Sequence, residues 1–296
     1  MGMFGRSSGR IDLPSIPAAL ARVIQITNLE NAPAEQVAGV VMLDQSLATK
    51  VLRIANSAYY GRIKRVETIT EAVLTLGFAS VRNLAASASV IDALFPKQMF
   101  PGFSWQDMWV HSVTCALATE AIYARTARGA GGKDESAFVA GLLHDIGKLM
   151  VARALPQKFI QIVDACREQG CEMAQAEKSI LSTDHAEIGG DLTREWDFPT
   201  KLQVGIAYHH DPGGAEEHED LAAAVQAANM LAKHMGNSYI VGSKVEIDLT
   251  EVADASGLRQ EDMEYIVARV REGLQQCGDI LAWRNSMPGS DLAAAA

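Results

Sequence analysis

The sequence predicts an all-α protein, and three observations support that fold class. Apolar residues recur at three- and four-residue spacing along most of the chain, which is the period of an amphipathic helix. Alternating apolar and polar residues, the pattern typical of strands, are scarce. Proline and glycine cluster at several breaks between the periodic segments. The 296 residues, 48% of them hydrophobic, suffice to bury a sizeable core.

The first hundred residues are expected to form a succession of helices. Five helices are expected. The first begins near Pro17, and the other four cover about residues 37–41, 47–52, 69–76 and 80–95. Pro96 and the segment 100–103, which reads FPGF, then interrupt the periodic pattern. An internal boundary is therefore expected near residue 100.

Beyond this break the chain is again predicted to be helical. The expected helices cover about residues 105–125, 134–153, 156–169, 185–196, 200–209, 220–235 and 259–276. Residues 243–249 fit either a short strand or an extended loop. In the first of these helices, Trp105 and Trp109 lie four residues apart on one face and are expected to anchor the core.

The charge balance limits the choice of partners. Lys and Arg number 26 against 36 Asp and Glu, a net charge of −10, so binding to nucleic acid or to an anionic membrane surface is not expected. The basic segment 62–65 is interpreted as a solvated loop. No apolar run approaches about 20 residues and no signal peptide is recognised, so a cytoplasmic protein is expected.

The cysteines do not indicate a zinc ribbon or a redox motif. Cys115, Cys166, Cys171 and Cys277 show no CxxC spacing. They are interpreted as small buried or incidental thiols.

Histidines give the main functional signal. Five of the seven fall between residues 111 and 210, namely His111, His144, His185, His209 and His210. Imidazole and carboxylate are ligands that zinc, iron and manganese share.

The pair His144-Asp145 lies in the apolar stretch AGLLHDIGKL, where an unpaired polar group would be costly to bury. A metal or phosphate ligand would satisfy the pair, and so would a hydrogen-bond network without metal. Asp184 and Glu187 have the spacing of a capping box and are expected to serve a helix end. Residues 216–220 are expected to form a solvated acidic turn before the next helix.

Several motifs together resemble a known family. The motif HDIGKL, preceded by His111 and followed by His185 and His209-His210, resembles the HD superfamily of metal-dependent phosphohydrolases. The stretch LDQSLATKVLRIANSAYYG, with MWVHSVTCALATEAI, HAEIGGDLTREWDFP and IAYHHDP, resembles the HDOD family of bacterial signalling output domains. The resemblance covers about residues 12–212.

This resemblance implies an all-α, HD-like helical bundle with an N-terminal helical lobe. The expected organisation is a tail, the N-terminal lobe, the HD-like bundle, a C-terminal helical extension that completes the bundle, and a disordered tail. These parts cover residues 1–11, 12–100, 101–212, 213–287 and 288–296.

The resemblance also implies roles for individual residues. His111, His144 and Asp145 match ligands of a first metal ion, and His185, His209 and His210 match the extra ligands of two-metal relatives. Lys148 matches a lysine that meets the substrate phosphate in catalytic relatives, where Asp145 would also serve catalysis.

One position departs from the family pattern. Asn229, in Val225-Gln226-Ala227-Ala228-Asn229, stands where HD enzymes carry a final aspartate ligand. Its neutral carbonyl oxygen should hold a cation more weakly than a carboxylate, which argues against hydrolysis. The sequence after IAYHHDP also lacks the GYP motif of cyclic-di-GMP phosphodiesterases.

Two functional hypotheses follow. The first is a bacterial regulatory module of HDOD type, with a His/Asp pocket for one or two divalent ions of iron, manganese or zinc, that transmits a signal by contact with a partner protein. The alternative is a metal-dependent phosphohydrolase acting on a nucleotide or another phosphoester. A small phosphate-containing ligand is compatible with either hypothesis.

Overall fold

The computed structural model describes residues 21, 34–42, 48–49, 51–52, 66–77, 81, 85, 94, 98–126, 135–243 and 245–276. Regular structure in these ranges is helical, which confirms the predicted all-α class. Extended pairing within them is limited to isolated bridges from Phe103 to Phe100 and Ile240. The described residues of 243–248 form a loop, which is one of the two structures predicted for this segment, and not a strand.

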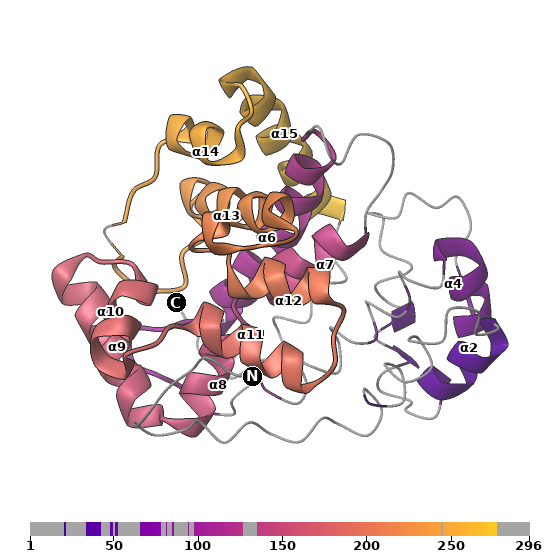
Figure 1. Ribbon diagram of the computed structural model, residues 1–296, viewed down its shortest axis with the longest axis horizontal. Helices are drawn as coiled ribbons and strands as arrows, with labels where there is room; N and C mark the ends of the chain where they lie inside the picture. The colour runs from indigo at the N-terminus through magenta and orange to yellow at the C-terminus, as the bar shows by residue number, and fades with distance from the viewer. Residues whose placement is uncertain are drawn as a thin grey trace, which may run out of the picture.

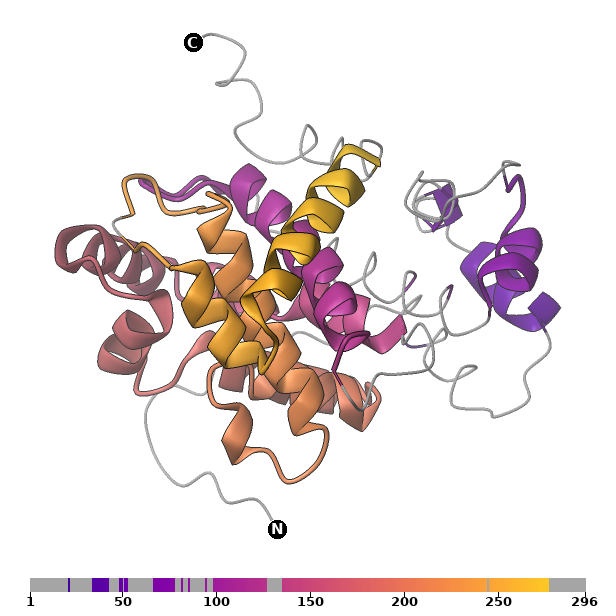
Figure 2. The ribbon, with the colours of Figure 1, turned by 90° about the horizontal axis from the view of Figure 1, so that it is seen from above.

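Two groups of helices can be distinguished. Helices α2 (Ala34–Met42) and α4 (Ile69–Leu76) pack on each other and lie apart from α6 to α15, as Figures 1 and 2 both show. Each group has its own apolar cluster, and Ala85 belongs to the smaller cluster whereas Leu94 belongs to the larger. The limits of the expected domains remain predictions, and the expected basic loop and both terminal tails lie outside the described residues.

The centre of the larger group is helix α6 (Trp105–Tyr123). It packs against α7 (Glu135–Leu143), α13 (Glu219–His234) and α15 (Gln260–Gln276). Because neighbours surround it, α6 is buried on most of its circumference rather than along one stripe. Trp105 and Trp109 are buried, as predicted.

The helix expected over 134–153 is in fact two helices. Helix α7 ends at Leu143 and α8 (Ile146–Ala154) begins after a turn made by His144 and Asp145. In a continuous helix, neighbouring side chains point about 100° apart. The turn removes that constraint, because Asp145 at φ −96° and ψ 9° lies outside helical geometry. The unpredicted break in the helix therefore lies at His144 and Asp145, the two residues with the strongest functional signal in the sequence.

Two glycines around this turn allow close helix packing. A Cβ atom on Gly141 would lie 2.5 Å from Oγ1 of Thr119 in α6. A Cβ atom on Gly147 would lie 2.0 Å from the backbone oxygen of His185. Since both distances are shorter than a van der Waals contact, only glycine lets α7 and α8 approach these partners.

The remaining helices complete the bundle. They are α9 (Pro156–Gln169), α10 (Met173–Leu181), α11 (His185–Glu195), α12 (Thr200–Ala207), the 3-10 turn η2 (Pro212–Gly214) and α14 (Leu249–Ser256). Helices α10 and α14 were not predicted from the sequence. For α14 a signal was available, because Asp248 and Glu251 form a reciprocal capping box. No helix in the described ranges is long and apolar enough to cross a membrane.

Candidate metal centre

Seven of the sequence-predicted site residues meet in one cluster, which is buried except for the partly buried His210. Helix α6 contributes His111, the α7–α8 turn contributes His144 and Asp145, and α8 contributes Lys148. His185 begins α11, and His209 and His210 lie in the turn after α12 rather than at the end of that helix. The histidine cluster is defined here as His111, His144, Asp145, Lys148, His185, His209 and His210.

Asp145 lies at the middle of the histidine cluster. Its Oδ1 is 3.3 Å from Nε2 of His144 and 3.2 Å from Nε2 of His185. Lys148 Nζ donates to the same oxygen at 2.6 Å. The hydroxyl of Tyr239 donates to Oδ2 at 3.2 Å and also bonds to the Lys148 ammonium. One carboxylate therefore connects groups from α8, α11 and the segment after α13.

Four histidines are held by their Nδ1 atoms in a way that orients Nε2. Carbonyl and carboxylate oxygens only accept hydrogen bonds, so each Nδ1 that bonds to one carries the proton. The acceptors are Asn237 O for His111 at 2.9 Å, Gly141 O for His144 at 2.8 Å, Ile206 O for His209 at 2.7 Å and Glu177 Oε2 for His185 at 2.5 Å. Nε2 of His111, His144 and His209 is then free to accept, which is the usual arrangement of metal-ligating histidines. Nε2 of His185 differs, because it lies 3.2 Å from Oδ1 of Asp145.

Spacing within the cluster fits metal coordination. Two ligand atoms about 2.0–2.1 Å from a zinc ion in tetrahedral geometry lie about 3.3 Å from each other. His144 and His185 lie at such distances from Asp145, and Nε2 of His210 is 3.0 Å from Nε2 of His185. Donor atoms of His144, Asp145 and His209 lie within 4.8 Å of one another, and so do those of His185, His209 and His210.

Burial leaves several polar atoms without partners. His111, His144 and His209 are fully buried, and Asp145, Lys148, His185 and Asn229 are at most 4% exposed. Nε2 of His144, Nε2 of His209 and Oδ1 of Asn229 have no hydrogen-bond partner among the described residues. An unsatisfied buried polar atom costs about 1–3 kcal/mol. A cation bound between His144 and His209 would satisfy their two Nε2 lone pairs, so these residues fit a metal ion.

Asn229 occupies a less direct position. It lies on α13 after Ala228, whose carbonyl oxygen is 3.7 Å from the sulfur of Cys115 in α6. Its Oδ1 is buried and unpartnered, as expected for a residue facing an internal polar site. Its role as a ligand stays a prediction.

Electrostatics separate the histidines into two kinds. Burial lowers the pKa of His111 to about 4 and that of His144 to about 3. Burial also lowers the pKa of His209 and His210, with help from the neighbouring imidazoles. Burial alone would lower the pKa of His185 too, but the carboxylates of Glu177 and Asp145 raise it above the usual value. Neutral imidazole is the form that binds metal.

The central acid stays ionised. Burial alone would raise the pKa of Asp145, yet His144, Lys148 and His185 together hold it well below its usual range. The cluster therefore contains a carboxylate whose charge is shared among several neighbours.

Three contributors to the site were not predicted from the sequence. Glu177 in α10 accepts from both the backbone N–H and Nδ1 of His185. Tyr239 bonds to Asp145 and Lys148, and Cys115 Sγ is 3.4 Å from Nε2 of His111. Glu177 and Tyr239 are distant in sequence from the residues that they support, so no local motif marked them. Cys115 lies one helical turn after His111, and that spacing was a usable signal.

The capping assignment near His185 is partly confirmed. Asp184 accepts hydrogen bonds from the backbone N–H groups of Ala186 and Glu187, so it caps α11. The Glu187 carboxylate instead accepts from the hydroxyl of Thr183. Asp184 thus fixes the start of α11 and with it the position of His185.

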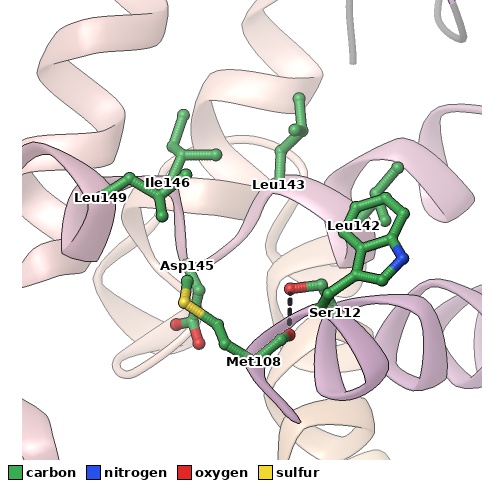
Figure 3. Close-up of a pocket in the computed structure, with 8 residues that line it drawn as sticks. Met108, Ser112, Leu142, Leu143, Asp145, Ile146 and Leu149 are labelled. Atoms are coloured by element: carbon green, nitrogen blue, oxygen red, sulfur yellow. Dashed lines mark hydrogen bonds between the residues drawn. The ribbon is translucent and has the colours of Figure 1, made fainter. Parts of the chain in front are cut away.

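A small pocket reaches the central carboxylate. It has a volume of about 10 Å³ and is lined by Met108, Trp109, Ser112, Leu142, Leu143, Asp145, Ile146 and Leu149. Figure 3 shows these side chains around the pocket and the hydrogen bond from Ser112 to the backbone oxygen of Met108. This space corresponds to about one water molecule.

Comparison with known proteins gives the family. The HDOD domain model matches residues 13–212. A protein from Shewanella amazonensis SB2B, provisionally named a phosphohydrolase, is 28% identical, with a TM-score of 0.72 over 92% of this chain and 96% of that one. An HDOD domain protein of unknown function from Geobacter sulfurreducens is 26% identical, with a TM-score of 0.73 over 93% of both chains.

Two further relatives differ in length. A protein from Marinobacter aquaeolei VT8, provisionally named a signal transduction protein, is 25% identical with a TM-score of 0.72, covering 95% of this chain and 62% of that one. An uncharacterized protein of Treponema pallidum (strain Nichols) is 24% identical over 230 residues, which are 76% of this chain. The chain spans only 43% of the length of that relative. Because the family match extends over more than half of the chain, the protein belongs to the HDOD family.

Proposed function

We propose that this protein is a regulatory module that holds one or two divalent transition-metal ions in the histidine cluster and signals by contact with a partner protein. The observation that carries this proposal is the set of buried Nε2 atoms of His111, His144 and His209, which the Nδ1 hydrogen bonds leave free to accept. Nitrogen and carboxylate donors of this kind suit iron, manganese or zinc.

Enclosure favours binding over turnover. Lys148, which a phosphoester would have to reach, is 2% exposed and is bound to Asp145 and Tyr239. The pocket that reaches Asp145 has room for about one water molecule and mostly apolar walls. A bare ion fits such a site more readily than a phosphoester does.

A bound ion would act by connecting helices. His111, Asp145, His185 and His209 come from four separate parts of the bundle, so a shared ion would favour the packing in which these parts meet. An ion that binds one packing more tightly than another shifts the populations by that difference in affinity. The partner would then recognise the favoured packing.

The first experiment is metal analysis of the full chain purified without added metal. The double variant His144→Ala/Asp145→Ala should lose the bound ion. The control variant His218→Asn removes a histidine outside the cluster, at φ 55°, where asparagine is tolerated. It should retain the metal content of the parent protein. Equal metal content in the double variant and the control would contradict the proposal.

The alternative function is metal-dependent phosphoester hydrolysis, where a bound ion would supply an activated water. The proximity of Lys148 to His144-Asp145 favours it, and the name of the Shewanella relative points the same way. Generic phosphomonoesters and phosphodiesters should be tested with iron and manganese. Turnover that disappears in the double variant but not in His218→Asn would favour the enzyme. Metal without turnover would favour the regulatory module.

A further inference from the structure

Cys115 is a buried thiol at one end of the histidine cluster. It lies on α6 one turn after His111 and is fully buried. Its sulfur is 3.4 Å from Nε2 of His111 and 3.7 Å from the carbonyl oxygen of Ala228. One S–H proton can serve only one of these acceptors at a time. The sulfur lies near Nε2 of His111, and Nδ1 of the same ring already donates to the carbonyl oxygen of Asn237.

The spacing of these atoms fits a mixed nitrogen and sulfur site. A sulfur about 2.3 Å and a nitrogen about 2.0 Å from a tetrahedral zinc ion lie about 3.5 Å apart. In the structure, Sγ of Cys115 and Nε2 of His111 are 3.4 Å apart. Donor atoms of Cys115, His111 and His144 all lie within 4.8 Å of one another. The third donor, Nε2 of His144, is buried and has no hydrogen-bond partner.

Charge gives an independent reason to involve the thiol. Imidazole binds a metal in its neutral form, so His111 and His144 bring no negative charge, and the amide of Asn229 on α13 is neutral as well. The charge of Asp145 is already shared among Lys148, Tyr239 and His185. A divalent ion at the α6 side of the cluster therefore needs another anion, and a thiolate from Cys115 would supply it.

We propose that Cys115, His111 and His144 form a thiolate-containing subsite that binds zinc or a similarly thiophilic divalent ion. This assignment rests on the metal binding proposed above and deepens it by naming an additional ligand and the class of ion. On binding, the S–H bond of Cys115 breaks, its electron pair goes to the metal and the proton passes to solvent.

The thiol remains protonated until an ion is present. Burial raises the pKa of Cys115 well above its usual value. A coordinated divalent ion lowers the pKa of the thiol by more than burial raises it, because the ion carries two positive charges and is bonded directly to the sulfur.

X-ray absorption spectroscopy of the zinc-loaded full chain tests this subsite. The expected spectrum contains a sulfur shell at about 2.3 Å beside nitrogen and oxygen neighbours at about 2.0–2.1 Å. Cys115→Ser should lose the sulfur shell and bind zinc about tenfold more weakly or worse, since even outer partners of ligands contribute that much. Cys171→Ser, which removes a half-buried thiol elsewhere, should leave both properties unchanged.

Cobalt provides a second readout that does not depend on zinc affinity. Cobalt(II) loading of the parent chain should produce a thiolate-to-cobalt charge-transfer band, and Cys115→Ala should lack it. Bound zinc with nitrogen and oxygen neighbours only, or an unchanged cobalt spectrum in Cys115→Ala, would overturn the subsite and leave the metal-binding function intact. Absence of bound metal in the parent chain would overturn both.

Discussion

The buried imidazole rings at the two ends of the histidine cluster differ in their hydrogen-bond acceptors and in the direction of their pKa shifts. One end, called the α6 end, comprises His111 on α6 and the neighbouring His144 in the α7–α8 turn. Both rings donate to backbone carbonyl oxygens, and burial lowers the pKa of both. At the α11 end, His185 donates to the carboxylate of Glu177, and its pKa is raised. All three rings are at most 1% exposed, so the acceptor rather than the depth of burial makes the difference.

This contrast shows how one cluster can combine neutral ligands with a histidine that retains a proton more readily. A backbone carbonyl fixes the tautomer without adding a full charge, whereas a carboxylate does both. Asp145 lies between the two ends and contacts each of them. Changes at Asp145 should therefore affect both ends, and changes at Glu177 only one.

The largest effect is expected when the shared carboxylate is removed. Asp145→Ala in metal-free protein would leave the buried ammonium of Lys148 without its anion, which costs about 3–5 kcal/mol of unfolding free energy. Urea unfolding at neutral pH measures this loss. The control Asp191→Ala breaks an exposed pair with Arg194 and should change stability by less than about 1 kcal/mol. Similar losses in the two variants would contradict the central role of Asp145.

Acid should destabilise the α6 end of metal-free protein. The folded-state pKa values of His111 and His144, about 4 and about 3, lie below the unfolded value of 6.5. The unfolded chain therefore takes up protons first, and the stability present above pH 6.5 is lost as the pH falls toward 4.

Between pH 7 and 5 the loss is about 2 kcal/mol for each of these two histidines. Unfolding free energies measured across this range check the slope. The control variant His218→Asn should retain it. A stability that stays flat between pH 7 and 5 would show that these rings are not buried as neutral groups.

Close packing of α8 against α11 depends on Gly147. Gly147→Ala would place a methyl group against the backbone oxygen of His185, with an expected loss of about 1–3 kcal/mol. Gly213→Ala is the matched control, because nothing lies within 4 Å of the added carbon. Thermal or urea unfolding of both variants gives the comparison. A loss at Gly147 no greater than that at Gly213 would mean that α8 and α11 can separate without cost.

The smallest expected effect distinguishes the two ends most sharply. Glu177→Gln keeps an oxygen acceptor for Nδ1 of His185 but removes the negative charge that raises the pKa of this histidine, so the pKa of His185 should fall. Titration of the ring signals by NMR measures it. Glu172→Gln, which alters a pair with Lys233, should leave His185 unchanged. An unaltered His185 in Glu177→Gln would contradict the carboxylate explanation.

Local sequence patterns predicted much of the helical framework. The expected helix over 69–76 coincides with α4, and those over 156–169 and 259–276 agree closely with α9 and α15. These helices have periodic apolar faces and clear ends, such as Gly170 in the left-handed conformation after α9. The error at 134–153 has a different origin. Apolar residues keep a helical spacing on both sides of His144-Asp145, and the contacts of Asp145 in the turn, His185 of α11 and Tyr239, lie far away in sequence.

By itself the sequence determined the all-α class, the histidines and acid that meet at the site, and the resemblance to the HDOD family, because these depend on residue type, short spacing and motif order. Only the tertiary structure decided which atoms face the site. Nδ1 acceptors such as Asn237 O and Ile206 O, the carboxylate of Glu177 and the sulfur of Cys115 reach the cluster through helix packing. Long-range packing brings such groups together, and neither periodicity nor composition encodes which distant residues will meet.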